Sequence, residues 1–218
     1  MKGGNQMNYF PIMLNIDHKK VVVVGGGQVA RQKIQALLPT KAKITVVSPT
    51  VTDEIETYVY EGKVRWINRY FEPTDLEGAT LIFAVTDQKE VNDAVEQATQ
   101  PWQLLSRADA KGRVDFINPA VVRRGDLTLT VATSGAHPGL TRKLKEDLAA
   151  QFDETYSDYI EFLKKARREI IETVSDKQKK RELIASLLDP QLEQWAKEQN
   201  WEKCNEYLHK MMEDQDKV

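Results

Sequence analysis

The chain has 218 residues, and its 31 lysines and arginines nearly balance its 33 aspartates and glutamates, giving a net charge of −2. This balance argues against a nucleic-acid or membrane partner, and no apolar run approaches the length of a membrane span. The one cysteine, Cys204, cannot form an internal disulfide and indicates a reducing, cytoplasmic location. Met7 is a second candidate start, which would make residues 1–6 a loose leader.

Residues 21–30 read VVVVGGGQVA, a valine run that leads into three glycines. The run predicts a buried strand, a tight turn and the start of a helix. In this G-x-G-x-x-A pattern, Gly25 permits the turn, Gly27 lets the backbone approach phosphates, and Ala30 lets the helix lie close to the strand. Unpaired amides at such a helix end bind the pyrophosphate of a dinucleotide. We therefore expect NAD here, bound by Gly25, Gly26, Gly27, Gln28, Val29 and Ala30.

The flanking segments favour this interpretation over an ordinary strand-to-helix turn, because an apolar helical face and a second strand, residues 44–47, follow the glycines. An NAD site usually places Asp or Glu after that strand to bond the ribose, but here Ser48, Pro49 and Thr50 follow. A hydroxyl can still bond a ribose. No arginine stands there to hold a 2′-phosphate, so NAD is slightly favoured over NADP, with Ser48 and Pro49 at the site.

Strands and helices alternate through the first half of the chain. The strand candidates are residues 64–67, residues 81–85 and a run that begins at residues 104–105, and a helix is predicted over residues 90–98. This alternation predicts a parallel sheet covered on both faces, a Rossmann-like α/β domain over residues 1–114.

Thr86 and Asp87 close the fourth predicted strand at its carboxyl end, where ligands bind in such sheets. Both are therefore candidate cofactor residues. For Asp87, a second interpretation is favoured, namely that its side chain caps the following helix.

A small α+β segment is predicted over residues 115–150. Residues 127–131 alternate apolar and hydroxyl side chains after a turn-like stretch at residues 123–126, which predicts a half-buried antiparallel strand. Pro138 can start a helix that runs to about residue 152.

Residues 151–218 are charged and carry Leu, Ile, Tyr and Trp at helical spacing, which predicts a C-terminal helical domain. Its aromatic residues are better explained by a packed core than by stacking on a ligand. The basic run at residues 177–181 is most simply a solvated face.

Several motifs occur in this order and at similar spacing in one family: YFPI (9–12), VVGGGQVA (23–30), FAVTD (83–87), PAVVRRG (119–125) and SGAHP (134–138). On these motifs the chain resembles the precorrin-2 dehydrogenase/sirohydrochlorin ferrochelatase family, the siroheme-synthase N-terminal module. The likeness spans residues 7 to 210 and is greatest to the short, stand-alone bacterial members. It implies NAD-dependent oxidation of precorrin-2 to sirohydrochlorin on the path to siroheme. It also implies a homodimer, with residues 115–150 as the central dimerisation segment.

Asp109 aligns with the aspartate that this family implicates in activity. It follows the fifth predicted strand, where its carboxylate could accept the departing proton or position the macrocycle through pyrrole N–H groups. On the residues alone, a loop aspartate that caps a turn is the competing interpretation. Family members usually carry an Asn and an apolar residue shortly before this aspartate, whereas this chain has Ser106 and Arg107.

The implied substrate bears many carboxylates, so positively charged partners are expected. Arg107 and Lys111 are the first candidates. Each cation by itself is more often a surface charge, and the further candidates are Arg113, Arg123, Arg124, Arg142 and Lys143.

The resemblance also makes the loop with Ser134, Gly135 and His137 a predicted substrate contact. For His137 alone, a role at the helix start without a ligand is the better interpretation. No metal motif is present, since His18, His137 and Cys204 lie far apart in the sequence.

We therefore expect a dehydrogenase without strong chelatase activity, which would leave iron insertion to a separate chelatase. Three alternatives stay open: a bifunctional dehydrogenase and ferrochelatase, a non-catalytic NAD-sensing domain, and a different nicotinamide oxidoreductase that acts on another substrate. The sensing domain would need neither Asp109 nor a tetrapyrrole cleft.

Overall fold

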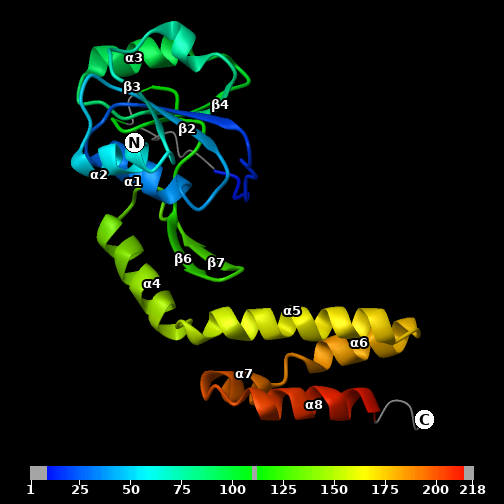
Figure 1. Cartoon of the computed structure of the whole chain (residues 1–218). Helices are drawn as coiled ribbons and strands as arrows, with labels where there is room; N and C mark the ends of the chain where they lie inside the picture. Colours follow the sequence, from blue (N-terminus) through cyan, green and yellow to red (C-terminus); the bar gives the residue numbers. More distant parts are fainter. Residues whose placement is uncertain (1–8, 110–111, 214–218) are drawn as a thin grey trace, which may run out of the picture. The chain divides into compact units, whose positions relative to one another are not determined.

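The computed structural model describes residues 9–109 and 112–213 (Figure 1). The chain divides into two compact units, Met1–Asn118 and Pro119–Val218. The finer three-part division at residues 114 and 150 stays a prediction. The expected leader at residues 1–6 and the candidate Lys111 lie outside the described residues.

The first unit is built on a five-stranded parallel sheet in the order β3-β2-β1-β4-β5. The strands are β1 (Lys20–Val24), β2 (Lys43–Val47), β3 (Arg65–Ile67), β4 (Ala79–Ala84) and β5 (Leu104–Arg107). The chain runs outward from β1 to β3 and then returns to pair β4 with the other side of β1. Such a reversal opens a crevice at the carboxyl ends of β1 and β4, where ligands bind in doubly wound sheets.

Helices cover both faces of this sheet: α1 (Gln28–Leu37) and α2 (Asp53–Tyr60) lie on one face and α3 (Lys89–Ala98) on the other (Figure 1). The alternation of β1 explains this, because Val21 and Val23 belong to one core cluster and Val22 to the other. The predicted Rossmann-like parallel sheet is confirmed.

The start of α3 corrects one expectation. Gln88 is the N-cap of this helix, and Asp87 lies outside it with an exposed side chain. The prediction that Asp87 caps the helix is therefore wrong. A short 3-10 helix, Pro73–Leu76, precedes β4, and two hydrogen bonds from Arg69 to Asp75 hold this connection.

The second unit begins with the antiparallel hairpin of β6 (Ala120–Arg124) and β7 (Leu127–Val131). The turn is narrower than predicted, because both arginines of the 123–126 stretch belong to β6. Gly125, with a φ of 54°, supplies the left-handed conformation that the turn requires.

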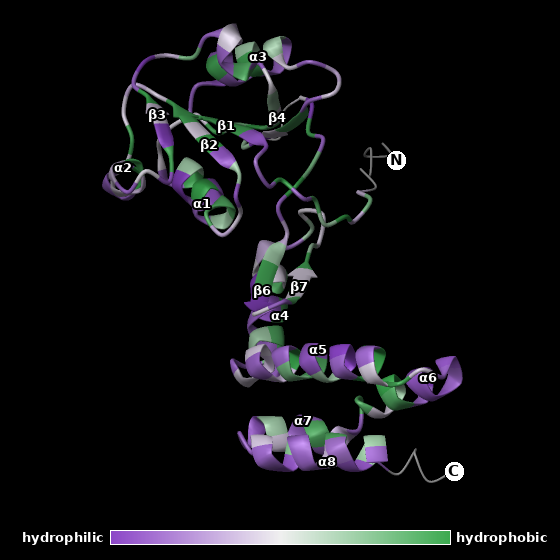
Figure 2. Cartoon of the chain, turned by 45° about the vertical axis from the view of Figure 1, so that its right-hand side comes forward, coloured by the Kyte–Doolittle hydropathy of each residue, from purple (hydrophilic) through white to green (hydrophobic). Residues whose placement is uncertain are grey.

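Helices form the rest of the second unit: α4 (Pro138–Gln151), α5 (Thr155–Thr173), α6 (Lys177–Ser186), α7 (Pro190–Lys197) and α8 (Trp201–Glu213). In Figure 2, α5, α7 and α8 carry both hydrophilic and hydrophobic stretches, as amphipathic helices do. Tyr159 and Phe162 are buried, and Trp195 and Trp201 pack against the same cluster. The prediction that these aromatic residues form a helical core is confirmed. None of the helices in the described ranges combines the length and apolarity needed to cross a membrane.

Candidate functional site

Gly25 makes the turn between β1 and α1. Its φ is 120°, and its amide donates to the carbonyl oxygen of Val47 at 3.0 Å. A Cβ at this position would lie 2.7 Å from the carbonyl oxygen of Val85. Both the backbone conformation and the space therefore require glycine here.

Gly26 is fixed by the loop that follows β2. A Cβ on Gly26 would lie 2.0 Å from the carbonyl oxygen of Thr50, and the amide of Thr52 donates to the carbonyl of Gly26 at 3.0 Å. Glycine here therefore permits the turn after β1 to contact the loop after β2. Sequence reasoning did not find this constraint, because the contacting carbonyl belongs to a different loop.

Gly27 is the N-cap of α1, and a Cβ built there would meet no atom within 4 Å. The amide of Arg31 donates to the carbonyl of Gly27 at 3.0 Å, which starts the helical hydrogen-bond ladder. The amides of Gln28, Val29 and Ala30 precede this ladder and have no acceptor within the helix. They form a positive end open toward an anion.

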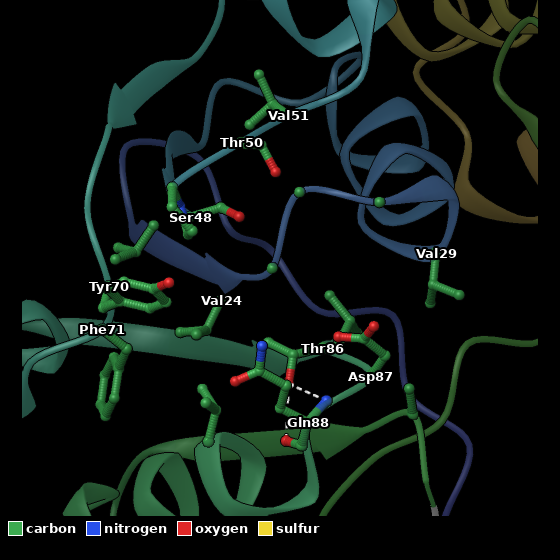
Figure 3. A pocket seen from close by; sticks show the side chains of 18 of the residues that line it. Val24, Val29, Ser48, Thr50, Val51, Tyr70, Phe71, Thr86, Asp87 and Gln88 are labelled. Carbon is green, nitrogen blue, oxygen red and sulfur yellow. Dashed lines mark hydrogen bonds between the residues drawn. The ribbon is translucent and has the colours of Figure 1, made fainter.

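These glycines line a cavity of about 580 Å³ (Figure 3). Its volume is within the usual range of about 300–1,000 Å³ for ligand sites. Ala30 is fully buried behind the turn, as expected of the small residue that lets α1 lie close to the sheet. All the other predicted cofactor residues line the cavity: Gly25, Gly26, Gly27, Gln28, Val29, Ser48, Pro49, Thr86 and Asp87.

Tyr70 and Phe71 also line this cavity, and sequence reasoning missed them. Figure 3 shows the two rings on one side and Val29 and Asp87 on the other. The aromatic pair follows β3 and carries no motif. It reaches the site because the strand order places the end of β3 at the same edge of the sheet as the glycine turn. Flat aromatic surfaces of this kind suit the rings of a nucleotide.

Asn92 holds the turn that carries Thr86. Its side chain is buried, its Oδ1 accepts from the amide of Thr86 at 3.2 Å, and its Nδ2 donates to the carbonyl of Thr86 at 3.0 Å. The Thr86 hydroxyl accepts from the amide of Gln88 at 3.2 Å, as Figure 3 shows. Sequence reasoning missed Asn92 as well, since a polar side chain on the buried face of a helix was its one signal.

Asp109 lies in a neighbouring cavity of about 260 Å³. This second cavity shares Thr86, Asp87 and Ala108 with the first, and Lys89 and Asn92 complete its lining. The carboxylate is half-buried just beyond the carboxyl end of β5. A group bound in the second cavity would therefore lie beside whatever occupies the first.

Arg107 binds Asp109 through two hydrogen bonds. Its Nε donates to Oδ1 at 3.0 Å and its terminal nitrogen to Oδ2 at 2.7 Å. The guanidinium also bonds Glu96 at 2.5 Å and Asp93 at 2.9 Å, both on α3. The hydrogen bonds that Arg107 donates to Asp109 are the largest cause that raises the pKa of Arg107, and burial opposes them.

The same cluster acts on Asp93, whose pKa is lowered by hydrogen bonds from Lys89 first and Arg107 second. With three carboxylate partners and a side chain that is 1% exposed, Arg107 has no open face for a substrate carboxylate. These contacts favour a structural role for Arg107, and its role as a substrate counter-ion stays a prediction.

The remaining predicted substrate residues belong to the second unit. Ser134 and Gly135 occupy the loop between β7 and α4 with φ values of 49° and 81°. His137 is the N-cap of α4, and its Nδ1 accepts from the amide of Leu140 at 3.0 Å. This contact agrees with the structural interpretation of His137.

Two of the other candidate cations, Arg113 and Arg124, have carboxylate partners in the protein. Arg113 pairs with Asp115 at 2.9 Å in the first unit, and Arg124 pairs with Glu154 at 3.3 Å in the second. Across the described part of the chain, no three His, Cys, Asp or Glu side chains gather in a way that could hold a metal ion.

The glycine turn, the positive helix end and the cavity at the strand reversal define a Rossmann-type dinucleotide-binding protein. Residues 12–120 match a family model described as NAD(P)-binding. A precorrin-2 dehydrogenase of Priestia megaterium is 35% identical over 182 residues, which cover 84% of this chain and 90% of the relative. The chain belongs to the precorrin-2 dehydrogenase family.

Other relatives agree with this assignment. A precorrin-2 dehydrogenase of Bacillus subtilis is 33% identical over 72% of this chain and 98% of its own length. Siroheme synthase 1 of Aeromonas salmonicida is 39% identical, but the match covers 31% of that longer protein. The solved structure of SirC, precorrin-2 dehydrogenase, superposes with a TM-score of 0.81 at 32% identity and covers 94% of this chain and 100% of SirC.

Proposed function

We propose that this protein oxidises precorrin-2 to sirohydrochlorin with NAD in the synthesis of siroheme. The single observation that carries the proposal is the pair of adjoining cavities, one formed by the glycine turn and the other containing Asp109. The family assignment supplies the substrate. A purely NAD-sensing domain would need the first cavity alone.

The residues present fit NAD. The amides of Gln28 and Val29 would bind its pyrophosphate, and the open space at Gly27 permits the close approach. Ser48 lines the same cavity and would bond a ribose hydroxyl, and Tyr70 with Phe71 would offer a ring surface. Bound NAD would supply the acceptor for a hydride from the macrocycle.

The protein's own part in the chemistry is assigned to Asp109. Oxidation removes a hydride and a proton from precorrin-2, so a base near the reacting carbon would accelerate the reaction. The Asp109 carboxylate lies beside the cofactor cavity and is held by Arg107, and a carboxylate has about four acceptor sites. It would accept the proton or hold the macrocycle through a pyrrole N–H group.

The test is anaerobic incubation of the purified protein with precorrin-2 and NAD, while the absorbance of NADH and sirohydrochlorin is recorded. We expect both to appear together at equal amounts. A folded protein that binds NAD by calorimetry but forms neither product would contradict the dehydrogenase and favour the NAD sensor. Absence of binding heat from both NAD and NADH at millimolar concentration would contradict the assignment of NAD as the cofactor.

We also propose a cytoplasmic homodimer that leaves iron insertion to a separate chelatase. Helix α4 supports the dimer, because it has no buried residue in the described chain and exposes Leu140 and Leu144. A helix with exposed apolar side chains four residues apart on one face is typical of an interface. Light scattering of the wild type should give twice the mass of the monomer. The Leu144→Glu variant should give the mass of a single monomer.

A further inference from the structure

Arg107 occupies an unusual position for an arginine, because its side chain is 1% exposed and faces three carboxylates. Two of these, Asp93 and Glu96, come from the same face of α3, and the third is Asp109. A buried guanidinium is costly unless its donors are matched by acceptors. Here Asp109 accepts hydrogen bonds on one side and the two α3 carboxylates accept them on the other, so the guanidinium is fixed in one orientation.

We propose that Arg107 is a positioning residue for the reaction, acting by holding the Asp109 carboxylate at the second cavity. This inference rests on the proposed function. The bidentate geometry sets the plane of the carboxylate, since Nε and a terminal nitrogen each bind a different oxygen. Asp93 and Glu96 act one step further away by orienting the guanidinium.

Gly112 provides a second, independent sign that this cluster is built into the fold. Its φ is 130°, and a Cβ there would lie 2.3 Å from Oε2 of Glu96 and 3.0 Å from a terminal nitrogen of Arg107. The backbone of Gly112 therefore lies directly against the ion cluster. The amide of Arg113 donates to the other oxygen of Glu96 at 3.1 Å, which links the backbone at residues 112–113 to α3.

Fixing the base in this way matters because catalysis depends on geometry. A shift of about 1 Å in a reacting group can cost about 100-fold in rate. Lysine at position 107 would keep the charge but could not bind two oxygens of one carboxylate and two further carboxylates with a planar fork. The Arg107→Lys substitution therefore keeps the positive charge and removes only the positioning of Asp109.

The experiment measures kcat and KM for precorrin-2 and NAD, together with the melting temperature, for wild type, Arg107→Lys and Arg113→Lys. Arg113 is a matched control, because it also forms an ion pair with the aspartate two positions later and is not among the residues that line the two cavities. We expect Arg107→Lys to lower kcat about 10-fold or more, with KM for NAD unchanged. Arg113→Lys should keep kcat within about twofold.

A double substitution separates positioning from general stability. If Arg107 acts through Asp109, Arg107→Lys should cause no further loss of kcat in an Asp109→Ala background. Multiplicative losses in the double variant would contradict the proposal, as would an unimpaired Arg107→Lys enzyme. If Arg107→Lys does not fold, Glu96→Gln takes its place with the same two expectations, and an unchanged kcat for that variant overturns the proposal.

The outcome also distinguishes this inference from the proposed function. A wild type that binds NAD but oxidises no precorrin-2 overturns both. An active wild type whose Arg107→Lys variant is equally active overturns the positioning role alone.

Discussion

The side-chain amide of Asn92 holds the peptide groups of Thr86 from both sides, accepting from its amide at 3.2 Å and donating to its carbonyl at 3.0 Å. Thr86 lines both cavities, so a buried residue on α3 determines the shape of the edge that they share.

Asn92→Ala should lower the free energy of unfolding by about 1–3 kcal/mol, because it leaves buried polar groups of Thr86 unsatisfied. It should also weaken NAD binding, since the turn at the cavity loses its support. Thr99→Ala is the matched control, because the Thr99 hydroxyl is also buried and donates to the carbonyl of Val95 on the same helix. Calorimetry that finds equal NAD affinity in both variants would contradict the role of Asn92.

Gly27→Asp should abolish NAD binding without destabilising the protein. The new side chain enters open space, and aspartate is a favourable N-cap, so we expect unchanged or slightly higher stability. The same carboxylate would repel the pyrophosphate and fill its place. The measurements are NAD titration by calorimetry and thermal unfolding. Retained NAD affinity would show that the phosphates lie elsewhere, and Gly27→Ala separates the effect of charge from that of bulk.

Asp109→Asn should lower kcat by about 100-fold or more, because general-base catalysis typically contributes 100- to 10,000-fold. Affinity for NAD should stay within about twofold, since Asp109 lines the second cavity and not the first. Stopped-flow measurement of NADH formation tests this. Full turnover by Asp109→Asn would rule out the assigned chemistry.

Gly112→Ala should impair both stability and turnover, because the added Cβ would collide with Glu96 and Arg107 at a φ of 130°. Gly78→Ala is the control, since Gly78 also has a positive φ of 69° but a Cβ there would meet no atom within 4 Å. Both variants should lose about 1 kcal/mol of stability to backbone strain. Only Gly112→Ala should lower kcat, and equal kcat for the two variants would contradict the link between this loop and the site.

Asp75 should make the stability of the protein sensitive to acid. Burial alone would raise the pKa of Asp75, but hydrogen bonds from Arg69 and the amide of Glu72 lower it below its ordinary value of 3.8. A depressed carboxyl pKa stabilises the folded state above the ordinary pKa, and this contribution is lost as the pH falls through the folded-state pKa.

The corresponding measurement is urea unfolding of wild type and Asp75→Asn at neutral pH and at pH about 3. Asp75→Asn should be less stable by about 1–2 kcal/mol at neutral pH, and the difference should shrink in acid. Glu61→Gln is the control, because the Glu61 and Lys63 side chains form an exposed pair. A difference that stays constant with pH would contradict the role of the Asp75 carboxylate.

Short-range patterns were enough to predict much of this molecule. The valine run and the glycines of residues 21–30 predict β1, its turn and α1, because side-chain alternation and a positive φ are local properties of the chain. The strand ends carrying Ser48 and Thr86 could be assigned to the site, since parallel strands end at one edge of a sheet. The helical aromatics could be assigned to a core on their spacing alone.

Contacts between distant segments decided the rest. Gly26 faces the carbonyl of Thr50, Tyr70 reaches the cavity through the strand order, and the guanidinium of Arg107 is enclosed by carboxylates from α3. Local propensity carries no information about which loop will lie against which helix. In the tertiary structure Arg107, which was predicted as a substrate ligand, is a buried partner of Asp109. A guanidinium can be buried there because acceptors from several segments of the chain converge on it.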